Sequence, residues 1–142
     1  MTSTTVSAQS VKKTSIEYIE NARLLLKQVS VEYSNGNYAK ADELASTAYL
    51  DNIEYVEAVL NKNGHSEMVS DLEKMMVIDL RAMIKDRVPL SQIDSEISLI
   101  DAKLSEAVTV VPEFPLTVVF IVVGSVIASI VALSRIKAAR TM

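Results

Sequence analysis

The sequence has no cysteine and no tryptophan, and it contains only one histidine, three glycines and three prolines in 142 residues. The lack of cysteine excludes disulfides, thiolate metal sites and thiol catalysis. One histidine provides little acid–base capacity, and no Ser/His/Asp spacing recurs, so we do not expect an enzyme. The scarcity of glycine and proline favours helices over a β-sandwich.

Basic residues are scarce over most of the chain. Residues 1–111 carry 11 basic and 17 acidic side chains, a net charge of −6, whereas residues 112–142 carry 3 basic and 1 acidic side chain, a net charge of +2. An acidic domain is a poor partner for nucleic acid or for an anionic lipid surface. It is compatible with metal cations and with basic protein surfaces.

A long apolar segment, residues 116–134, carries no charge at all. Its nineteen residues would rise about 28 Å as a helix, close to the hydrocarbon thickness of a bilayer, so we predict a transmembrane helix. Gly124, Ser125 and Ala128 place small side chains about one turn apart within it. They either pack against another membrane helix or face lipid.

The flanks of this segment predict its orientation. No basic residue lies just before it, and three follow it: Arg135, Lys137 and Arg140. The positive-inside rule places residues 135–142 in the cytoplasm, as a basic tail, and the acidic domain outside the cell membrane. Export needs a signal that residues 1–10 lack, although Val6-Ser7-Ala8 resembles a cleavage site, so we expect an upstream start or a trimmed signal. The alternative is a tail-anchored protein that faces the cytoplasm.

Hydrophobic periodicity predicts four helices between residues 14 and 108. Apolar side chains recur at helical spacing over about 14–33, 38–62, 66–85 and 91–108. Short turns separate these segments and force neighbouring helices to be antiparallel. The predicted fold class is therefore all-α, an up-down four-helix bundle plus one C-terminal transmembrane helix. Residues 1–13 are expected to form a disordered tail, and residues 109–115 a linker.

The helical pattern also predicts which side chains face inward. The expected core includes Leu26, Leu44, Leu72, Met76, Ile97 and Leu104. In the second helix, an α-helical wheel places Tyr55, Val56 and Val59 on the same inner face as Ala48. Ser91 and Asp94 have the spacing of a capping box, which predicts the start of the fourth helix.

Three features stand out between residues 30 and 107. They are the turn Gly36–Ala39, the tract Ala48-Tyr49-Leu50-Asp51 with Glu54 and Glu57, and Leu80-Arg81 followed by Ile84. Together they resemble a helical extracytoplasmic domain of prokaryotic high-affinity iron permeases of the Ftr type. The multi-span membrane part and the REXXE iron motifs of those permeases are absent from this chain. The resemblance implies a domain that assists iron acquisition or docks on a permease.

The region that follows the predicted bundle has a second resemblance. Pro112, Glu113 and Phe114 precede the apolar segment, and the basic tail follows it. This order resembles the archaeal PEF-type C-terminal sorting signal, with these three residues as the sorting motif. The resemblance implies an archaeal cell-surface protein whose tail is either cut by an archaeosortase or kept as an anchor.

An acidic strip on the second predicted helix is a candidate metal site. Asp51, Glu54 and Glu57 follow at three-residue spacing, which stacks them along one side of an α-helix. Hard cations such as Fe³⁺, Mn²⁺ or Ca²⁺ bind carboxylate oxygens. The alternative is an ordinary solvated helix face. Iron is favoured only because the resembled family acts on it.

The third predicted helix holds two further candidates. Asp79 has apolar neighbours on the helical wheel, so we expect a buried carboxylate paired with Arg23, or else a metal ligand inside the bundle. Four methionines share its apolar side: Met68, Met75, Met76 and Met83. Thioethers suit Cu(I), but at helical spacing we expect them to fill the core. His65, beside a turn, is expected at the surface or as a helix cap.

Three functions remain open on this basis. The leading hypothesis is a membrane-anchored extracytoplasmic domain that assists metal handling, most directly iron acquisition, by binding a cation or docking on a permease. The second is a non-catalytic accessory subunit of a membrane-embedded complex, such as a copper or haem oxidoreductase. The third is a sortase-processed cell-surface protein. In each case we expect the lipid bilayer and other membrane proteins as partners, and no nucleic acid.

Overall fold

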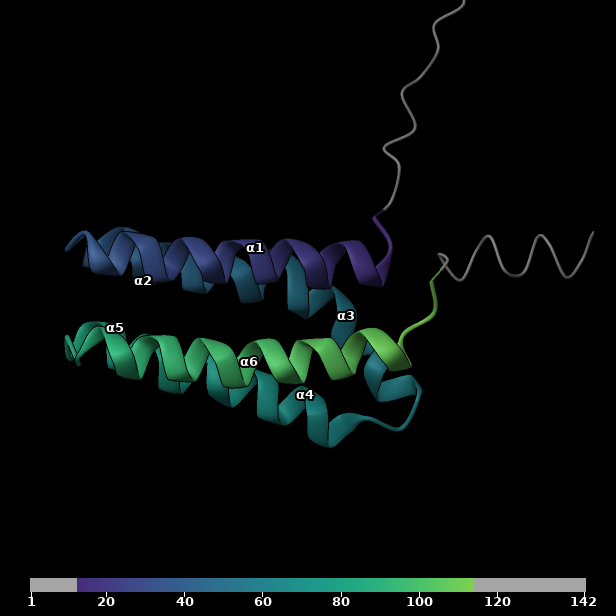
Figure 1. Ribbon diagram of the computed structural model, residues 1–142. Helices are drawn as coiled ribbons and strands as arrows, with labels where there is room; N and C mark the ends of the chain where they lie inside the picture. The colour runs from purple at the N-terminus through teal and green to yellow at the C-terminus, as the bar shows by residue number, and fades with distance from the viewer. Residues whose placement is uncertain (1–12, 114–142) are drawn as a thin grey trace, which may run out of the picture.

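The computed structural model describes residues 13–113, and these residues form four long helices without any strand (Figure 1). The first is α1 and the fourth is α6, whereas the second and third each contain a π-helical turn. The second helix comprises α2, η1 and α3, and the third comprises α4, η2 and α5. Their bounds are Ser15–Ser34 for α1, Tyr38–Ala48 for α2, Tyr49–Ile53 for η1, Glu54–Lys62 for α3, Ser66–Glu73 for α4, Lys74–Asp79 for η2, Leu80–Lys85 for α5 and Leu90–Val110 for α6.

The four helices run alternately in opposite directions, and both ends of the described chain lie at the same end of the bundle (Figure 1). The predicted all-α, up-down bundle is therefore confirmed for this part of the chain. None of the helices within residues 13–113 has the length and apolar character needed to cross a bilayer. The predicted transmembrane helix, residues 116–134, and the basic tail lie outside the described residues.

All three turns between the helices close with the same pattern of hydrogen bonds. Three residues past the last residue of each helix, an amide N–H donates to the carbonyl five residues earlier, at 2.9 Å in the first two turns and 3.3 Å in the third. This Schellman motif needs a residue in the left-handed conformation just before that amide. Gly36 and Gly64 provide it with φ of 79° and 83°, whereas the third turn uses Arg87 with φ of 51°.

The first helix starts as expected, whereas the cap of the fourth differs from the prediction. Thr14 caps α1 with a full capping box: its hydroxyl accepts from the N–H of Glu17 at 3.1 Å, and the Glu17 carboxylate accepts from the N–H of Thr14 at 2.6 Å. The predicted capping box at Ser91 and Asp94 is wrong. The fourth helix begins one residue before Ser91, and Pro89 occupies its N-cap position without a side-chain cap. Proline suits a helix start because it has no N–H there to leave unpaired.

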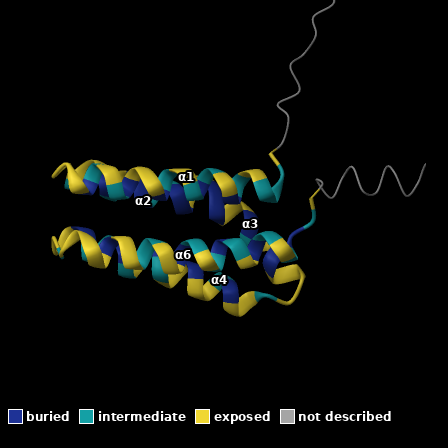
Figure 2. Ribbon diagram, in the orientation of Figure 1, coloured by how far each residue is buried: buried dark blue, intermediate teal, exposed yellow. Residues whose placement is uncertain are grey.

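The core fills the space between the four helices, and Figure 2 shows the buried residues on the faces that they turn toward one another. Its largest fully buried side chains are Ile19, Leu26, Val29, Ile53, Leu60, Leu72, Met76, Leu80, Ile84, Ile93, Ile100 and Leu104. Five of the six predicted core residues are buried, and Ile97 is only partly buried. Within residues 13–113, every buried polar side-chain atom has a hydrogen-bond partner.

Two different spacings of buried residues build this core. The first helix buries Ile19, Ala22, Leu26, Val29 and Tyr33, and the fourth buries Ile93, Ile100, Leu104, Ala107 and Val111 next to it. With partly buried Ile97 between Ile93 and Ile100, these positions alternate steps of three and four, the heptad spacing of ordinary packed α-helices. The third helix instead buries Met68, Leu72, Met76, Leu80 and Ile84 at steps of four. The second helix buries two adjacent rows, each at steps of four: Ala41, Ala45, Tyr49 and Ile53, and Leu44, Ala48, Asn52, Val56 and Leu60.

The π turns explain how a stripe with steps of four stays on one side. In an α-helix each such step drifts by about 40°, so four steps would carry the stripe through about 160° and out of the core. A π turn hydrogen-bonds to the fifth residue rather than the fourth, and it thereby absorbs one extra residue. The remaining drift is about 60°, which keeps the stripe facing inward. The turn η1 does this in the second helix, and η2 does it in the third.

The same extra residue overturns one prediction about the second helix. Tyr55 was expected inside, but it is 63% exposed, and Val59 is only partly buried. Val56 was also expected inside and is buried, and Leu60, which was not expected there, completes the inner face. An α-helical wheel is correct up to Ala48 but places Tyr55 and Val59 too far inward after it, because η1 lies between.

Candidate functional site

The structure separates the three acids of the predicted strip. Asp51 lies in η1 and Glu54 begins α3, and both are exposed, whereas Glu57 is partly buried. The Glu57 carboxylate accepts a hydrogen bond from the hydroxyl of Tyr49. The strip is therefore divided into two solvated acids and one acid held by a phenol.

Tyr49 brings together acids that the sequence places far apart. Its side chain is buried, and burial raises the pKa of its hydroxyl, as do the hydrogen bond to Glu57 and the negative charges of Glu57, Glu73 and Glu54. Glu73 belongs to α4 on the third helix. The structure thus shows a neutral phenol that is hydrogen-bonded to Glu57 and feels the negative charge of Glu54 and Glu73. We call these four residues the Tyr49 cluster: Tyr49, Glu54, Glu57 and Glu73.

No three acidic or histidine side chains within residues 13–113 converge closely enough to hold a metal ion. The Tyr49 cluster offers oxygen donors, the type that hard cations prefer, but as a partial set. The fourth predicted ligand, Asp79, lies on the other flank of the third helix, next to α6. Metal binding by these acids stays a prediction.

Asp79 is not the buried partner of Arg23, so that prediction is wrong. Its side chain is 34% exposed and accepts a hydrogen bond from Lys74, five residues earlier on the same helix. The extra residue in η2 places Leu80 rather than Asp79 above Met76 in the core. Asp79 moves to the edge of the helix as a result.

Glu96 on α6 faces this edge. Burial raises the pKa of Glu96, and the negative charge of Asp79 raises it further. The pair Lys74–Asp79 and this carboxylate thus form a small charged seam between the third and fourth helices. The seam was not predicted, because nothing local in the sequence marks Glu96 as partly buried.

Two arginines join pairs of helices. Arg23 on α1 holds Asp101 on α6 with bonds of 2.6 and 3.0 Å and also contacts Glu20 at 2.9 Å. Arg81 on α5 holds Asp42 on α2 with bonds of 2.8 and 3.0 Å. Each arginine lowers the pKa of the aspartate that it holds. Sequence separations of 78 and 39 residues left these pairs without any local signal.

One buried polar side chain lies within the second helix. Asn52, in η1, is 1% exposed. Its carbonyl oxygen accepts from the amide of Asn21 on α1 at 2.7 Å, and its own amide donates to the carbonyl of Thr47 at 3.1 Å. Asn52 therefore binds the π turn to the first helix.

The remaining residues named from the sequence lie in the core, at helix ends or outside the described range. Met68 and Met76 are buried, and Met75 and Met83 pack against the core, as expected for core filling. His65 occupies the N-cap position of α4 without a side-chain hydrogen bond to the helix. Pro112 and Glu113 follow α6. Four predicted residues lie outside the described range: Phe114, Gly124, Ser125 and Ala128.

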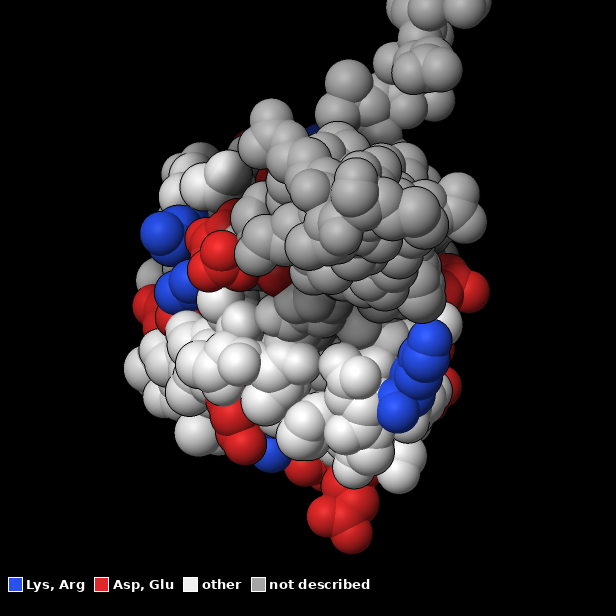
Figure 3. Space-filling model, turned by 90° about the vertical axis from the view of Figure 1, so that its right-hand side faces the viewer, with Lys and Arg blue, Asp and Glu red and all other residues white. Residues whose placement is uncertain are grey.

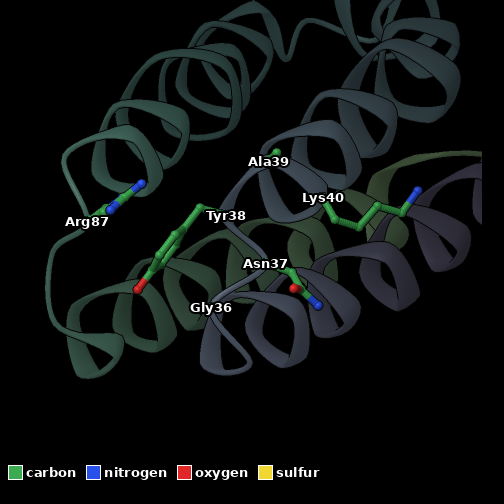
Figure 4. Close-up of a pocket in the computed structure, with 6 residues that line it drawn as sticks. All are labelled: Gly36, Asn37, Tyr38, Ala39, Lys40 and Arg87. Carbon is green, nitrogen blue, oxygen red and sulfur yellow. The ribbon is translucent and has the colours of Figure 1, made fainter.

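A surface hollow lies at the end of the bundle opposite the described chain ends. It has a volume of about 440 Å³ and is lined by Gly36, Asn37, Tyr38, Ala39, Lys40 and Arg87. The guanidinium of Arg87 lies 4.7 Å from the ring centre of Tyr38, and Lys40 extends away from this pair (Figure 4). Lys40 itself contacts Glu43 at 3.2 Å. Both cations thus already have partners on the protein.

The visible rim of the opposite end carries charges of both signs. Lysine or arginine and acidic side chains both lie around it (Figure 3). A rim of mixed sign has no strong field that would select an anionic lipid surface.

Comparison with known proteins finds no matching family model, no similar curated protein and no similar solved structure.

Proposed function

We propose that this chain is a membrane-anchored helical domain that acts by docking on a partner protein in the same membrane. In this proposal residues 14–108 lie outside the cell, residues 116–134 span the bilayer and residues 135–142 lie in the cytoplasm. The domain assists its partner without catalysing a reaction. The leading partner is a metal permease, and the alternative is a membrane-embedded enzyme complex.

The observation that carries the proposal is where α6 ends. Its last residue is Val110, and the apolar segment begins at Leu116, so five residues connect them. Even fully extended, this connection reaches only about 20 Å. A spanning segment would hold the bundle against the membrane surface. A partner in the same bilayer then meets it at an effective concentration of about millimolar, so that even a weak interface is occupied.

One feature favours a role with a hard cation. The Tyr49 cluster pairs one carboxylate with a phenol and has two further acids nearby, and acidic residues repel one another until a cation or a basic group neutralises them. Because the cluster is a partial ligand set, a cation would bind tightly only when a partner supplies more oxygens. Iron remains the leading cation through the resemblance described above.

Purification from native membranes in mild detergent tests the proposal. We expect the full chain to resist extraction by alkali and to co-purify with one membrane protein in constant ratio. Protease added to intact cells should remove residues 14–108. Extraction by alkali alone, or full protection from protease, would contradict the anchored outside domain. An intact mass that ends near the PEF motif would support the sortase-processed alternative.

Metal analysis of the same preparation tests the cation role separately. We expect bound iron or manganese in the complex, and its loss in the double variant Glu54→Gln with Glu57→Gln. The variant Glu106→Gln, at an exposed acid on α6, is the control and should keep the metal. Equal metal content in both variants would remove the cation role and leave docking in place.

A further inference from the structure

One helix face of the bundle combines exposed acidic side chains with exposed apolar ones. Six residues of the second helix form this acidic outer face: Leu50, Asp51, Glu54, Tyr55, Ala58 and Asn61. All are exposed, and the two large apolar side chains among them, Leu50 and Tyr55, are 50% and 63% exposed. Exposed apolar residues are common singly, but here two of them share a face with acids.

The charge of this face is of one sign. No lysine or arginine occurs between residues 44 and 61. Among the described residues, neither Asp51 nor Glu54 takes part in an ion pair, although Asp42 and Glu43, earlier in the same helix, do. The acidic outer face has no cation of its own and thus leaves the charge of these two acids open to a partner.

The apolar part of the face is already ordered. The ring of Tyr55 stacks on Tyr18 of α1 with ring centres 5.1 Å apart and planes 13° apart. An exposed aromatic side chain that is held in place loses little entropy when it is covered by a partner, which is why tyrosine is enriched at interfaces. Ala58, also exposed, leaves room for a close approach beside it.

We infer that the acidic outer face of the second helix is the docking surface for a partner segment that carries lysine or arginine together with an apolar side chain. Charge complementarity selects this occupant, because open acids attract basic groups and an apolar side chain covers Leu50 and Tyr55. The inference rests on the proposed function, since the short connection to the apolar segment is what holds the face beside membrane partners.

Two other occupants fit the face poorly. An anionic bilayer surface would be repelled by Asp51 and Glu54. A second copy of this chain, in a symmetric dimer, would place the same acids against each other. Like charges in contact cost binding energy, so neither surface matches the face as a basic segment does.

Site-directed photocrosslinking in native membranes tests the inference. Because the chain has no cysteine, Ala58→Cys provides a single attachment site for a thiol-reactive benzophenone. Ala82→Cys and Ala102→Cys are matched controls, since both alanines are exposed on the third and fourth helices. We expect the full chain to form one adduct with a membrane protein from Ala58→Cys and little from the controls.

Charge variants then test the chemistry of the contact. Added to Ala58→Cys, the double change Asp51→Lys with Glu54→Lys should lower the adduct yield by about tenfold, because it replaces attraction by repulsion. Glu106→Lys, on the fourth helix, should leave the yield unchanged. A thermal melt of each variant checks folding, and these exposed positions should not shift it.

The outcomes separate this inference from the proposed function. An adduct from Ala82→Cys or Ala102→Cys but not from Ala58→Cys overturns the docking face and keeps a membrane partner. An adduct that is insensitive to charge reversal, that has the mass of two copies of this chain, or that contains lipid also overturns the inference. No protein adduct from any of the three positions overturns docking itself.

Discussion

The first and fourth helices build their half of the core differently from the second and third. In α1 and α6 the buried residues alternate steps of three and four, and the helices stay α-helical throughout. In the second and third helices the buried residues follow steps of four, and each helix contains one π turn. The two pairs are also joined separately, by Arg23–Asp101 and by Arg81–Asp42.

This difference shows that one extra residue in a helix can decide which of its side chains face the core. A helix with steps of four cannot keep its apolar face inward unless a π turn absorbs the surplus. The π turns are therefore part of the pattern of the core and not accidents at its edge. They also set which residues face outward, including Tyr55 and Asp79.

The largest expected effect comes from deleting one residue in each kind of helix. Deletion of exposed Leu24 from α1 turns the rest of that helix by about 100° and brings polar residues into the core. Its cost should approach the whole stability of the domain, about 5 kcal/mol or more. Deletion of exposed Leu50 should instead convert η1 to α-helix and leave the same residues buried.

Circular dichroism melts of the full chain in detergent compare the two deletions. The Leu50 deletion should keep a cooperative transition, and the Leu24 deletion should lose it. If both deletions unfold the domain equally, the π turn does not absorb one residue as described.

A smaller effect is expected at the polar contact inside the π turn. Asn52→Ala removes the hydrogen bonds to Asn21 and Thr47 and leaves their polar groups poorly satisfied, at a cost of about 1–3 kcal/mol. Asn61→Ala, at an exposed position of the same helix, should change stability by less than about 0.5 kcal/mol. Equal melting of both variants would show that the π turn does not depend on its link to the first helix.

The two arginine–aspartate pairs should each contribute about 1 kcal/mol, because both are partly exposed. Asp42→Asn should lower the free energy of unfolding more than Asp101→Asn, since their side chains are 25% and 38% exposed.

The same two pairs should make stability depend on pH. Both aspartates have a pKa lowered by their arginine, so their contribution to stability is present above the unfolded pKa of about 3.9 and is lost as pH falls through the folded pKa. Urea titrations from pH 7 to pH 2 should therefore show a steeper loss for the wild type than for the double variant. Parallel curves would count against this origin of acid sensitivity.

The smallest effect concerns the third turn, which joins a helix with a π turn to one without. Arg87 holds a left-handed conformation that costs a residue with a side chain about 1 kcal/mol relative to glycine. Arg87→Gly should therefore be more stable than Arg87→Ala by about that amount, and both lose the contact with Tyr38. A melting temperature of the alanine variant equal to or above that of the glycine variant would refute strain at this turn.

The sequence predicted the elements of the fold well and the surroundings of some side chains wrongly. The predicted second and third helices match the observed bounds, and Gly36 and Gly64 end helices as expected. Glycines and periodic apolar residues act over a few neighbouring positions, so they can be recognised in the sequence. The predicted partner of Asp79 and the inner position of Tyr55 were wrong, because both followed from a continuous α-helical wheel.

By itself the sequence determined that the described part is an all-α bundle, since its apolar spacing, short turns and scarce glycine leave no other way to bury Leu26, Leu72 and Leu104 together. Only the tertiary structure decided where the π turns lie and which acids meet, because a helix takes an extra residue only to fit the neighbours that it packs against. Arg23 contacts Asp101, and Arg81 contacts Asp42, although these partners lie far apart in the sequence, so no local pattern encodes either pair.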